Sequence, residues 1–132
     1  MIKEKVTLWN REFDLPIKYN CYPGEEVTAI QKEAKKEFCS NTSGVMEALE
    51  EIKQYIEQTS EAEVKAESIN NIFKYVIPKR IFIPRAEKKI VAILCDYKFD
   101  MENGIAVIFE NGKFFGTDNW EYSPETGILK IP

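Results

Sequence analysis

Residues 90–115 read IVAILCDYKFDMENGIAVIFENGKFF, and this stretch holds the strongest structural signals in the chain. Residues 90–95 and 105–109 are unbroken apolar runs that are too short for helices. Such runs are typical of strands covered on both faces. Asn111-Gly112 favours a type I′ turn, because both positions tolerate positive φ. The stretch therefore predicts three neighbouring strands, the last two joined as a hairpin.

Alternating patterns predict a second hairpin at the N-terminus. Apolar and polar residues alternate over 5–9 and again over 13–19, which is typical of half-buried strands. Pro16 lies inside the second run. Because proline cannot donate a hydrogen bond to a neighbouring strand, we expect this strand at a sheet edge or near a bulge.

Helical periodicity occupies the middle of the chain. Three amphipathic helices are predicted, the first after Pro23-Gly24, the second after Ser43, and the third opened by a capping box at residues 60–63. The third should end before Pro78. The apolar stripes are Val27, Ile30, Ala34 and Phe38, then Val45, Leu49, Ile52 and Ile56, then Ala66, Ile69, Phe73 and Val76.

The order of these elements predicts the fold class. A hairpin, three helices and a strand-rich C-terminal half indicate an α+β fold, with the helices packed on one face of a mostly antiparallel sheet. A turn at residues 124–127 and a short strand at 128–131 should complete it. The absence of a linker or repeat predicts one domain over residues 1–132.

Composition narrows the classes of function. The net charge of −4 disfavours nucleic acid as a direct partner, since an acidic surface repels phosphates. No apolar stretch is long enough to span a membrane, and no secretory signal opens the sequence. Three cysteines without a close pair fit a reducing compartment. We therefore expect a cytoplasmic protein that does not contact membranes.

The chain has no histidine. This excludes nucleophiles activated by histidine and the usual imidazole zinc sites, whereas catalysis by carboxylates, lysine or tyrosine stays open. We expect a protein that is not an enzyme, with no catalytic residue, no cofactor and no metal. Cys95 ends an apolar run and is predicted to be a core residue.

The densest polar cluster lies between the two central strands. It contains Asp96, Asp100, Glu102 and Asn103. The conformation of a turn is by itself enough to explain these residue types. Alternatively, clustered oxygens can hold Ca²⁺ or Mg²⁺, and paired carboxylates can share acid–base catalysis.

Two further surface groups stand out. Trp120 and Tyr122 lie beside Asp118 and Glu121, a mixture found in binding hot spots and equally in rim packing. The second group is a cluster of five basic residues, Lys79, Arg80, Arg85, Lys88 and Lys89. We interpret them as ordinary solvent-exposed charges beside a strand, and the alternative is a phosphate or RNA site.

The string CDYKFDMENG resembles the Cys-Asp-Trp-Asp-x-Glu-His-Gly signature of a group of small bacterial proteins of unknown function. The matching residues are Cys95, Asp96, Phe99, Asp100, Glu102 and Gly104. Tyr97-Lys98 lengthen the segment, and Asn103 replaces the histidine. The resemblance covers mainly residues 76–118.

Such proteins are similar in size and acidity to immunity proteins of contact-dependent and polymorphic toxin systems. The resemblance implies a non-enzymatic inhibitor whose partner is a cognate toxin domain, with the oligomeric state left open. The expected partner-binding residues are Asp96, Asp100, Glu102, Asp118, Trp120 and Glu121. The alternative is a metal- or small-ligand-binding accessory domain that uses the turn around Asp100, and a carboxylate-dependent enzyme is a third possibility.

Overall fold

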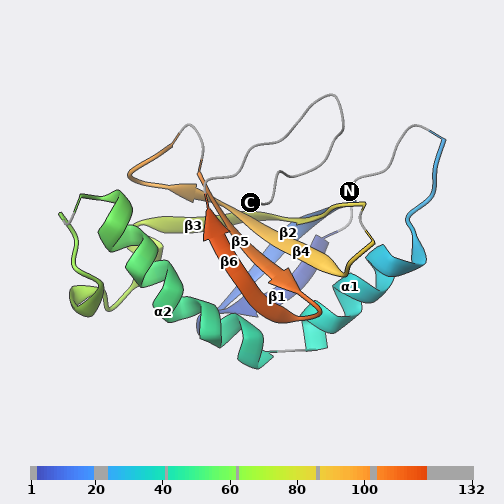
Figure 1. Cartoon of the computed structure of the whole chain (residues 1–132), viewed down its shortest axis with the longest axis horizontal. Coiled ribbons are helices and arrows are strands. Elements are labelled where there is room, and N and C mark those ends of the chain that lie inside the picture. Colours follow the sequence, from blue (N-terminus) through green and yellow to red (C-terminus); the bar gives the residue numbers. More distant parts are fainter. Residues whose placement is uncertain are drawn as a thin grey trace.

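A curled six-stranded sheet carries two helices (Figure 1). The computed structural model describes residues 3–19, 24–40, 42–61, 63–85, 87–101 and 104–118. The strands are β1 (Lys3–Leu8), β2 (Arg11–Tyr19), β3 (Val76–Ile83), β4 (Ile90–Tyr97), β5 (Ile105–Glu110) and β6 (Lys113–Asp118). The helices are α1 (Ala29–Ser40) and α2 (Thr42–Thr59), followed by the single 3₁₀ turns η1 (Ala66–Ser68) and η2 (Ile72–Lys74).

The sheet is mixed, with its strands in chain order from β1 to β6. Four neighbouring pairs are antiparallel, whereas β2 and β3 are parallel. The parallel pair arises because the chain leaves β2, forms both helices and returns to start β3 in the same direction. The α+β class and the mostly antiparallel sheet are therefore confirmed, and the crossover adds the one parallel pairing.

The predicted N-terminal hairpin is present, with its turn at Trp9-Asn10. Both residues have positive φ, 50° and 70°, as the tight turn between Leu8 and Arg11 requires. Trp9 is nevertheless buried, and its Nε1 donates a hydrogen bond of 2.9 Å to the carbonyl oxygen of Val45 in α2. The hairpin tip is thus fastened to the second helix.

Pro16 lies where β2 lacks a partner on one side. It faces Lys3 of β1, but the pairing of β2 with β3 covers only residues 17–19 opposite 81–83. β2 is therefore an edge locally at Pro16, although it is second in the strand order. The β3–β4 register also shifts between Pro78 and Arg80, so a second proline lies at a bulge.

Two apolar clusters cover the two faces of the central strands. The larger lies under α1 and α2 and includes Ile93 and Phe109, while the smaller lies on the opposite face and includes Leu94 and Ile108. Buried residues of β4 alternate between the two clusters, so the prediction of a central strand covered on both faces is confirmed.

The prediction of a third helix is wrong. The capping box at residues 60–63 does not form as predicted, because Ser60 Oγ accepts a hydrogen bond from the backbone N–H of Val64 and Glu61 has a φ of 55°. The chain then runs through η1 and η2, and Val76 begins β3. Ala66, Ile69 and Ile72 are buried at a three-residue spacing, which a 3₁₀ turn satisfies as well as an α-helix does.

The Asn111-Gly112 turn is confirmed, with φ values of 54° and 77° between β5 and β6. The predicted turn at 124–127 and the strand at 128–131 lie outside the described residues. Within the described ranges, neither helix combines the length and the apolar composition that crossing a membrane requires.

Candidate functional site

The turn after β4 contains Asp100, and Asp96 lies just before it near the end of β4. The backbone of this turn is fixed by three hydrogen bonds. Lys98 N–H donates to Tyr75 O at 2.8 Å, Asp100 N–H to Tyr97 O at 3.1 Å, and Gly104 N–H to Asp100 O at 2.8 Å. Gly104 has a φ of 67°, which glycine adopts without strain. These backbone hydrogen bonds and the positive φ of Gly104 show that this segment forms a turn.

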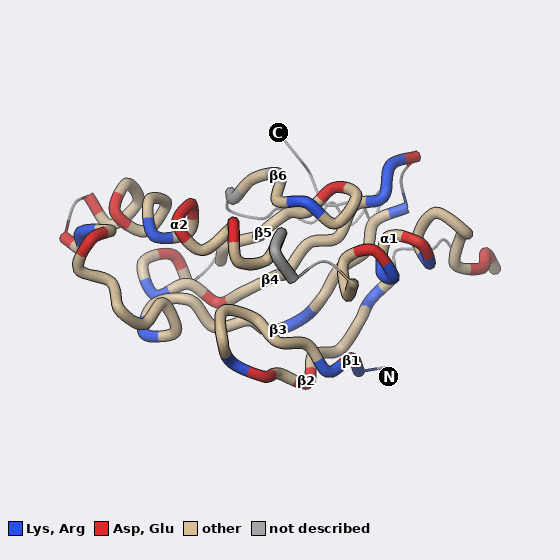
Figure 2. The backbone as a smooth tube through the Cα atoms, turned by 90° about the horizontal axis from the view of Figure 1, so that it is seen from below, with Lys and Arg blue, Asp and Glu red and all other residues tan. Residues whose placement is uncertain are grey.

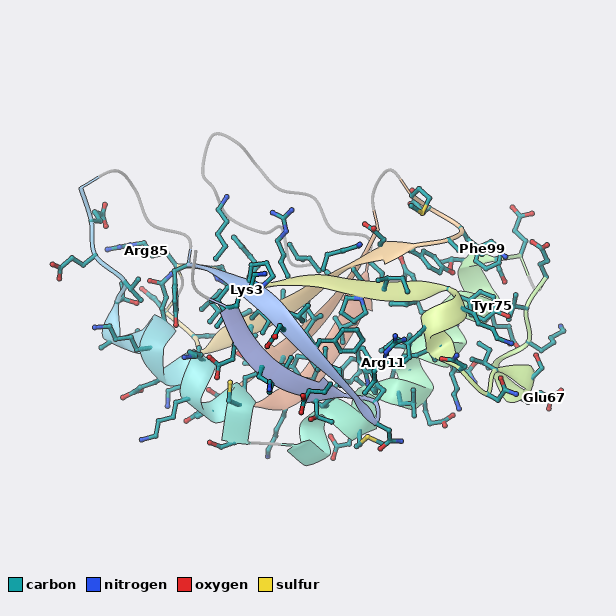
Figure 3. The ribbon with its side chains drawn as sticks, turned by 180° about the vertical axis from the view of Figure 1, so that it is seen from behind. Lys3, Arg11, Glu67, Tyr75, Arg85 and Phe99 are labelled. Atoms are coloured by element: carbon teal, nitrogen blue, oxygen red, sulfur yellow. The ribbon has the colours of Figure 1, made fainter. Side chains whose placement is uncertain are left out.

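An aromatic stack lies beside this turn (Figure 3). The rings of Tyr75 and Phe99 are stacked with centroids 6.0 Å apart, and Lys98 Nζ lies 5.8 Å from each centroid. Met101, two residues beyond Phe99, exposes 67% of its surface. We call Tyr75, Lys98, Phe99, Asp100 and Met101 the aromatic end.

Tyr97 connects the aromatic end to the core. Its ring meets Phe99 edge-on at 5.7 Å, and its hydroxyl is hydrogen-bonded to the hydroxyl of Thr59 in α2. Burial raises the pKa of the Tyr97 hydroxyl, the bond to Thr59 lowers it, and the charge of Asp100 raises it further. The bond between Tyr97 and Thr59 thus connects the end of β4, from which the turn starts, to α2.

The structure places the six predicted partner-binding residues unevenly. Asp96 lies near the end of β4 and pairs with Lys79 at 3.7 Å, and Asp100 lies in the turn. Asp118 ends β6, where its backbone pairs with Ala106 at the same end of the sheet, but its side chain is outside the description. Glu102, Trp120 and Glu121 also lie outside the described residues. Asp96 and Asp100 therefore lie at one end of the sheet, and their role in binding a partner stays a prediction.

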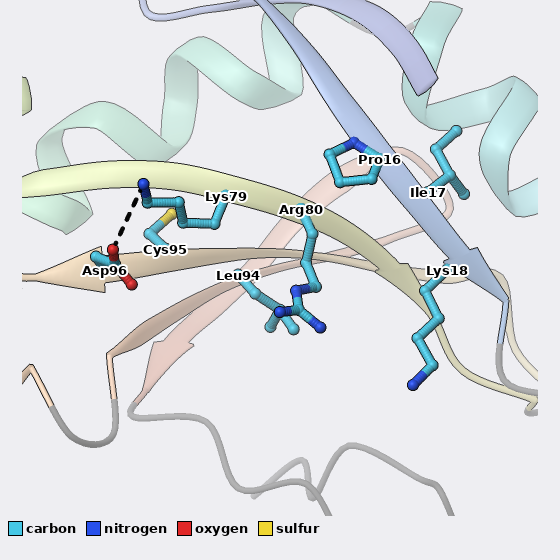
Figure 4. Close-up of a pocket in the computed structure, with 8 residues that line it drawn as sticks. All are labelled: Pro16, Ile17, Lys18, Lys79, Arg80, Leu94, Cys95 and Asp96. Atoms are coloured by element: carbon cyan, nitrogen blue, oxygen red, sulfur yellow. Dashed lines mark ion pairs between the residues drawn. The ribbon is translucent and has the colours of Figure 1, made fainter. Parts of the chain in front are cut away.

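A hollow of about 690 Å³ opens next to Asp96 (Figure 4). It lies where β2 and β3 separate, beside the bulge of β3, and β4 supplies its floor. We call it the split hollow. Its described lining consists of Pro16, Ile17, Lys18, Lys79, Arg80, Leu94, Cys95 and Asp96. Sequence reasoning missed this site, although two prolines within strands, Pro16 and Pro78, signalled a break in pairing there.

The basic residues that looked like one cluster in the sequence are dispersed by the fold. Arg85 pairs with Glu25, Lys88 with Glu110, and Lys89 with Glu33 and Glu37. Lys79 pairs with Asp96 at the split hollow. Arg80 makes no ion pair with any residue in the described ranges and is exposed. Four of the five residues thus form ion pairs within the fold, and Arg80 is an exposed residue of β3 without one among the described residues.

Comparison with known proteins gives a single family. Residues 2–121 match the family described as a domain of unknown function, DUF6985. The chain belongs to the DUF6985 family. No curated protein and no solved structure matches it. The matched range of this DUF6985 chain includes both the aromatic end and the split hollow.

Possible metal and thiol chemistry can be assessed for the described part of this DUF6985 domain. No group of three carboxylate or thiol side chains gathers there to hold an ion. One carboxylate, Asp96, lies among the described lining of the split hollow. Burial raises the pKa of the Cys95 thiol strongly, with a smaller contribution from Asp96, so Cys95 stays protonated in its place in the core.

Cys95 should therefore resist alkylation in the folded protein. Because the reactive species is the thiolate, iodoacetamide at mildly alkaline pH should leave Cys95 unmodified and should label it fully in concentrated guanidinium chloride. Peptide mapping by mass spectrometry measures both states, with the exposed Cys39 as a comparison in the same sample. Rapid labelling of Cys95 without denaturant would show that the strand opens or that the thiol is activated.

Proposed function

We propose that this chain is a non-enzymatic binding protein of the immunity type, which neutralises a cognate bacterial toxin domain through its aromatic end. The observation that supports this proposal is a partly exposed group of aromatic, sulfur-containing and acidic side chains at and beside a hydrogen-bonded turn. Tyr75, Phe99 and Met101 supply apolar surface, while Asp96 and Asp100 supply charge. Aromatic residues and methionine are enriched in protein interfaces and their hot spots.

The rigidity of the aromatic end favours binding over a flexible role. Three backbone hydrogen bonds hold the turn, and Tyr97 joins it to α2 through Thr59. A preorganised surface loses little conformational entropy when a partner docks. Ile77, which exposes 38% of its surface, faces Asp96 across the β3–β4 pair and extends the apolar surface along the sheet.

The charge of this chain's surface indicates the charge expected of the partner. Helix α2 contains four glutamates and a single lysine, whereas α1 mixes both signs (Figure 2). With Asp100 in the turn near the end of α2, these glutamates favour a basic partner, because complementary charge accelerates association. Toxin domains that act on nucleic acid carry such basic surfaces as a consequence of binding phosphates.

The first experiment identifies the partner and tests its toxicity. Tagged protein is captured from a lysate of its own bacterium, and the stoichiometric co-eluting domain is identified by mass spectrometry. That domain is then expressed under inducible control in another bacterial host, with and without this chain. Growth arrest by the domain alone and rescue on co-expression are expected. A co-eluting domain that does not arrest growth would refute the immunity role.

The second experiment tests the surface. Asp100→Lys should weaken binding of the toxin domain at least tenfold, which corresponds to about 1.4 kcal/mol or more. The reason is that the substitution places a like charge against a basic partner. Met101→Ala should weaken it by a smaller factor. The matched control is Glu26→Lys, an identical charge change at an exposed position outside the aromatic end. Calorimetry measures each Kd, and equal effects of Asp100→Lys and Glu26→Lys would move the interface elsewhere.

A further inference from the structure

We propose that the split hollow is a binding site for a small organic anion with an apolar body, whose anionic group is held by Arg80. Asp96 lies at this site and is also expected to contact the toxin, but Arg80 is neither part of the aromatic end nor among the residues expected to contact the toxin. The inference rests on the shape of the hollow, its charge and its apolar floor.

The shape of the hollow is built into the backbone. β2 and β3 pair over three residues only, so the strands separate before Ile17, and the register shift between Pro78 and Arg80 displaces β3 at the same level. The resulting volume, about 690 Å³, lies within the range of roughly 300–1,000 Å³ that is usual for small-molecule sites. A cavity set by strand separation exists before any ligand arrives.

The charge of the hollow opposes that of the whole chain. Among the described residues, three basic side chains and one carboxylate line it, in a protein whose net charge is −4. Lys79 is paired with Asp96, but at 3.7 Å and with side chains exposed by 54% and 48%, so water screens the pair and its contribution is small. Arg80 has no carboxylate partner among the described residues, and its guanidinium can bind an oxyanion through two parallel hydrogen bonds.

The floor of the hollow is apolar. Arg80 faces Leu94 across the β3–β4 pair, and Pro16 lies on the adjoining strand. Arg80, Lys18 and Leu94 extend to the same side of the strands (Figure 4). A ligand whose apolar body contacts Leu94 and Pro16 can therefore place an anionic group at Arg80 without leaving the hollow. A cation of the same shape would face repulsion from the guanidinium of Arg80.

The test uses the full chain and two fluorescent probes that differ in one group. One probe is 8-anilinonaphthalene-1-sulfonate, an amphipathic anion, and the other is N-phenyl-1-naphthylamine, which has the same aromatic body without the sulfonate. Fluorescence titration should give one saturable site for the sulfonate and binding at least about tenfold weaker for the neutral probe, since an ionic hydrogen bond is lost. Octanoate should displace the sulfonate, whereas octylammonium should not. Equal affinity for the two probes would overturn the proposal.

Substitutions then assign the site. Arg80→Gln should weaken binding of the sulfonate probe about tenfold and leave the affinity for the neutral probe unchanged. Lys113→Gln removes the same charge at an exposed position of the β5–β6 hairpin and should change neither affinity. Unaltered thermal melting of both variants shows that the sulfonate does not report unfolding. If Arg80→Gln binds the sulfonate as tightly as the unmodified chain does, the hollow is not the site, whatever the outcome of the toxin experiments.

Discussion

Phe109→Ala is expected to lower the free energy of unfolding by about 4 kcal/mol, the usual loss for removing a fully buried phenylalanine. Phe109 is completely inaccessible to solvent in β5. Its ring lies 5.1 Å from that of Phe38 in α1 and 6.2 Å from that of Phe114 in β6. Truncation therefore opens a cavity between the sheet and the first helix, where neither neighbour can move to fill it without breaking its own packing.

Equilibrium unfolding in urea, followed by circular dichroism, measures this loss. Met101→Ala provides the control, because a side chain that exposes 67% of its surface should change stability by less than about 0.5 kcal/mol when shortened. A loss below about 1.5 kcal/mol for Phe109→Ala would mean that the site collapses and that α1 is not anchored on β5.

Trp9→Ala is expected to cause a loss of similar size, about 4 kcal/mol, for a different combination of reasons. The indole is 5% exposed, contacts the ring of Phe73 at a centroid distance of 6.3 Å, and donates to Val45 O at 2.9 Å. The substitution removes the packing and the hydrogen bond that fasten the hairpin to α2. Alanine keeps the φ of 50° that Trp9 already holds, so the substitution does not relieve this unfavourable backbone conformation.

Trp9→Gly distinguishes the effect of losing the side chain from the effect of the backbone conformation. Glycine also removes the indole, but it adopts positive φ without steric penalty, so the loss should be about 0.5–1 kcal/mol smaller than for alanine. This order is the reverse of that expected in an ordinary strand, where glycine is the worse replacement. If alanine proves the milder change, Trp9 does not hold the left-handed conformation in solution.

The strands were predictable because their signals are local. Alternation over 13–19, the apolar runs at 90–95 and 105–109, and Asn111-Gly112 each fix an element without reference to the rest of the chain. The first helix has a signal that sequence reasoning missed. Thr28 and Gln31 form a reciprocal capping pair, with Gln31 N–H donating to Thr28 Oγ1 at 3.1 Å and Thr28 N–H to Gln31 Oε1 at 2.9 Å.

The third helix failed because its periodicity is ambiguous. Buried residues three apart suit an α-helix and a chain of 3₁₀ turns alike. The segment between α2 and β3 has little distance to cover, since Thr59 at the end of α2 is hydrogen-bonded to Tyr97, which pairs with Val76 at the start of β3. Two short turns joined by extended residues make this connection.

The candidate sites were predictable in part for the same reason. Asp96 and Asp100 follow a recognisable strand, so their place at the sheet end could be derived from the sequence. The stack of Tyr75 on Phe99 depends on the β3–β4 register, which no local pattern gives. The split hollow depends on the parallel pairing of β2 with β3, which follows only from the crossover through both helices.

The short junction between β2 and β3 has a consequence for folding order. Strands β3 to β6 follow one another as antiparallel neighbours, so their contacts are close in sequence and can form early. The N-terminal hairpin joins them only after the whole helical segment has closed a long loop, through three paired residues and through side chains such as Trp9 and Phe13. Amide protons of β1 and β2 should therefore exchange through partial opening, while those of β4 and β5 should exchange only on global unfolding.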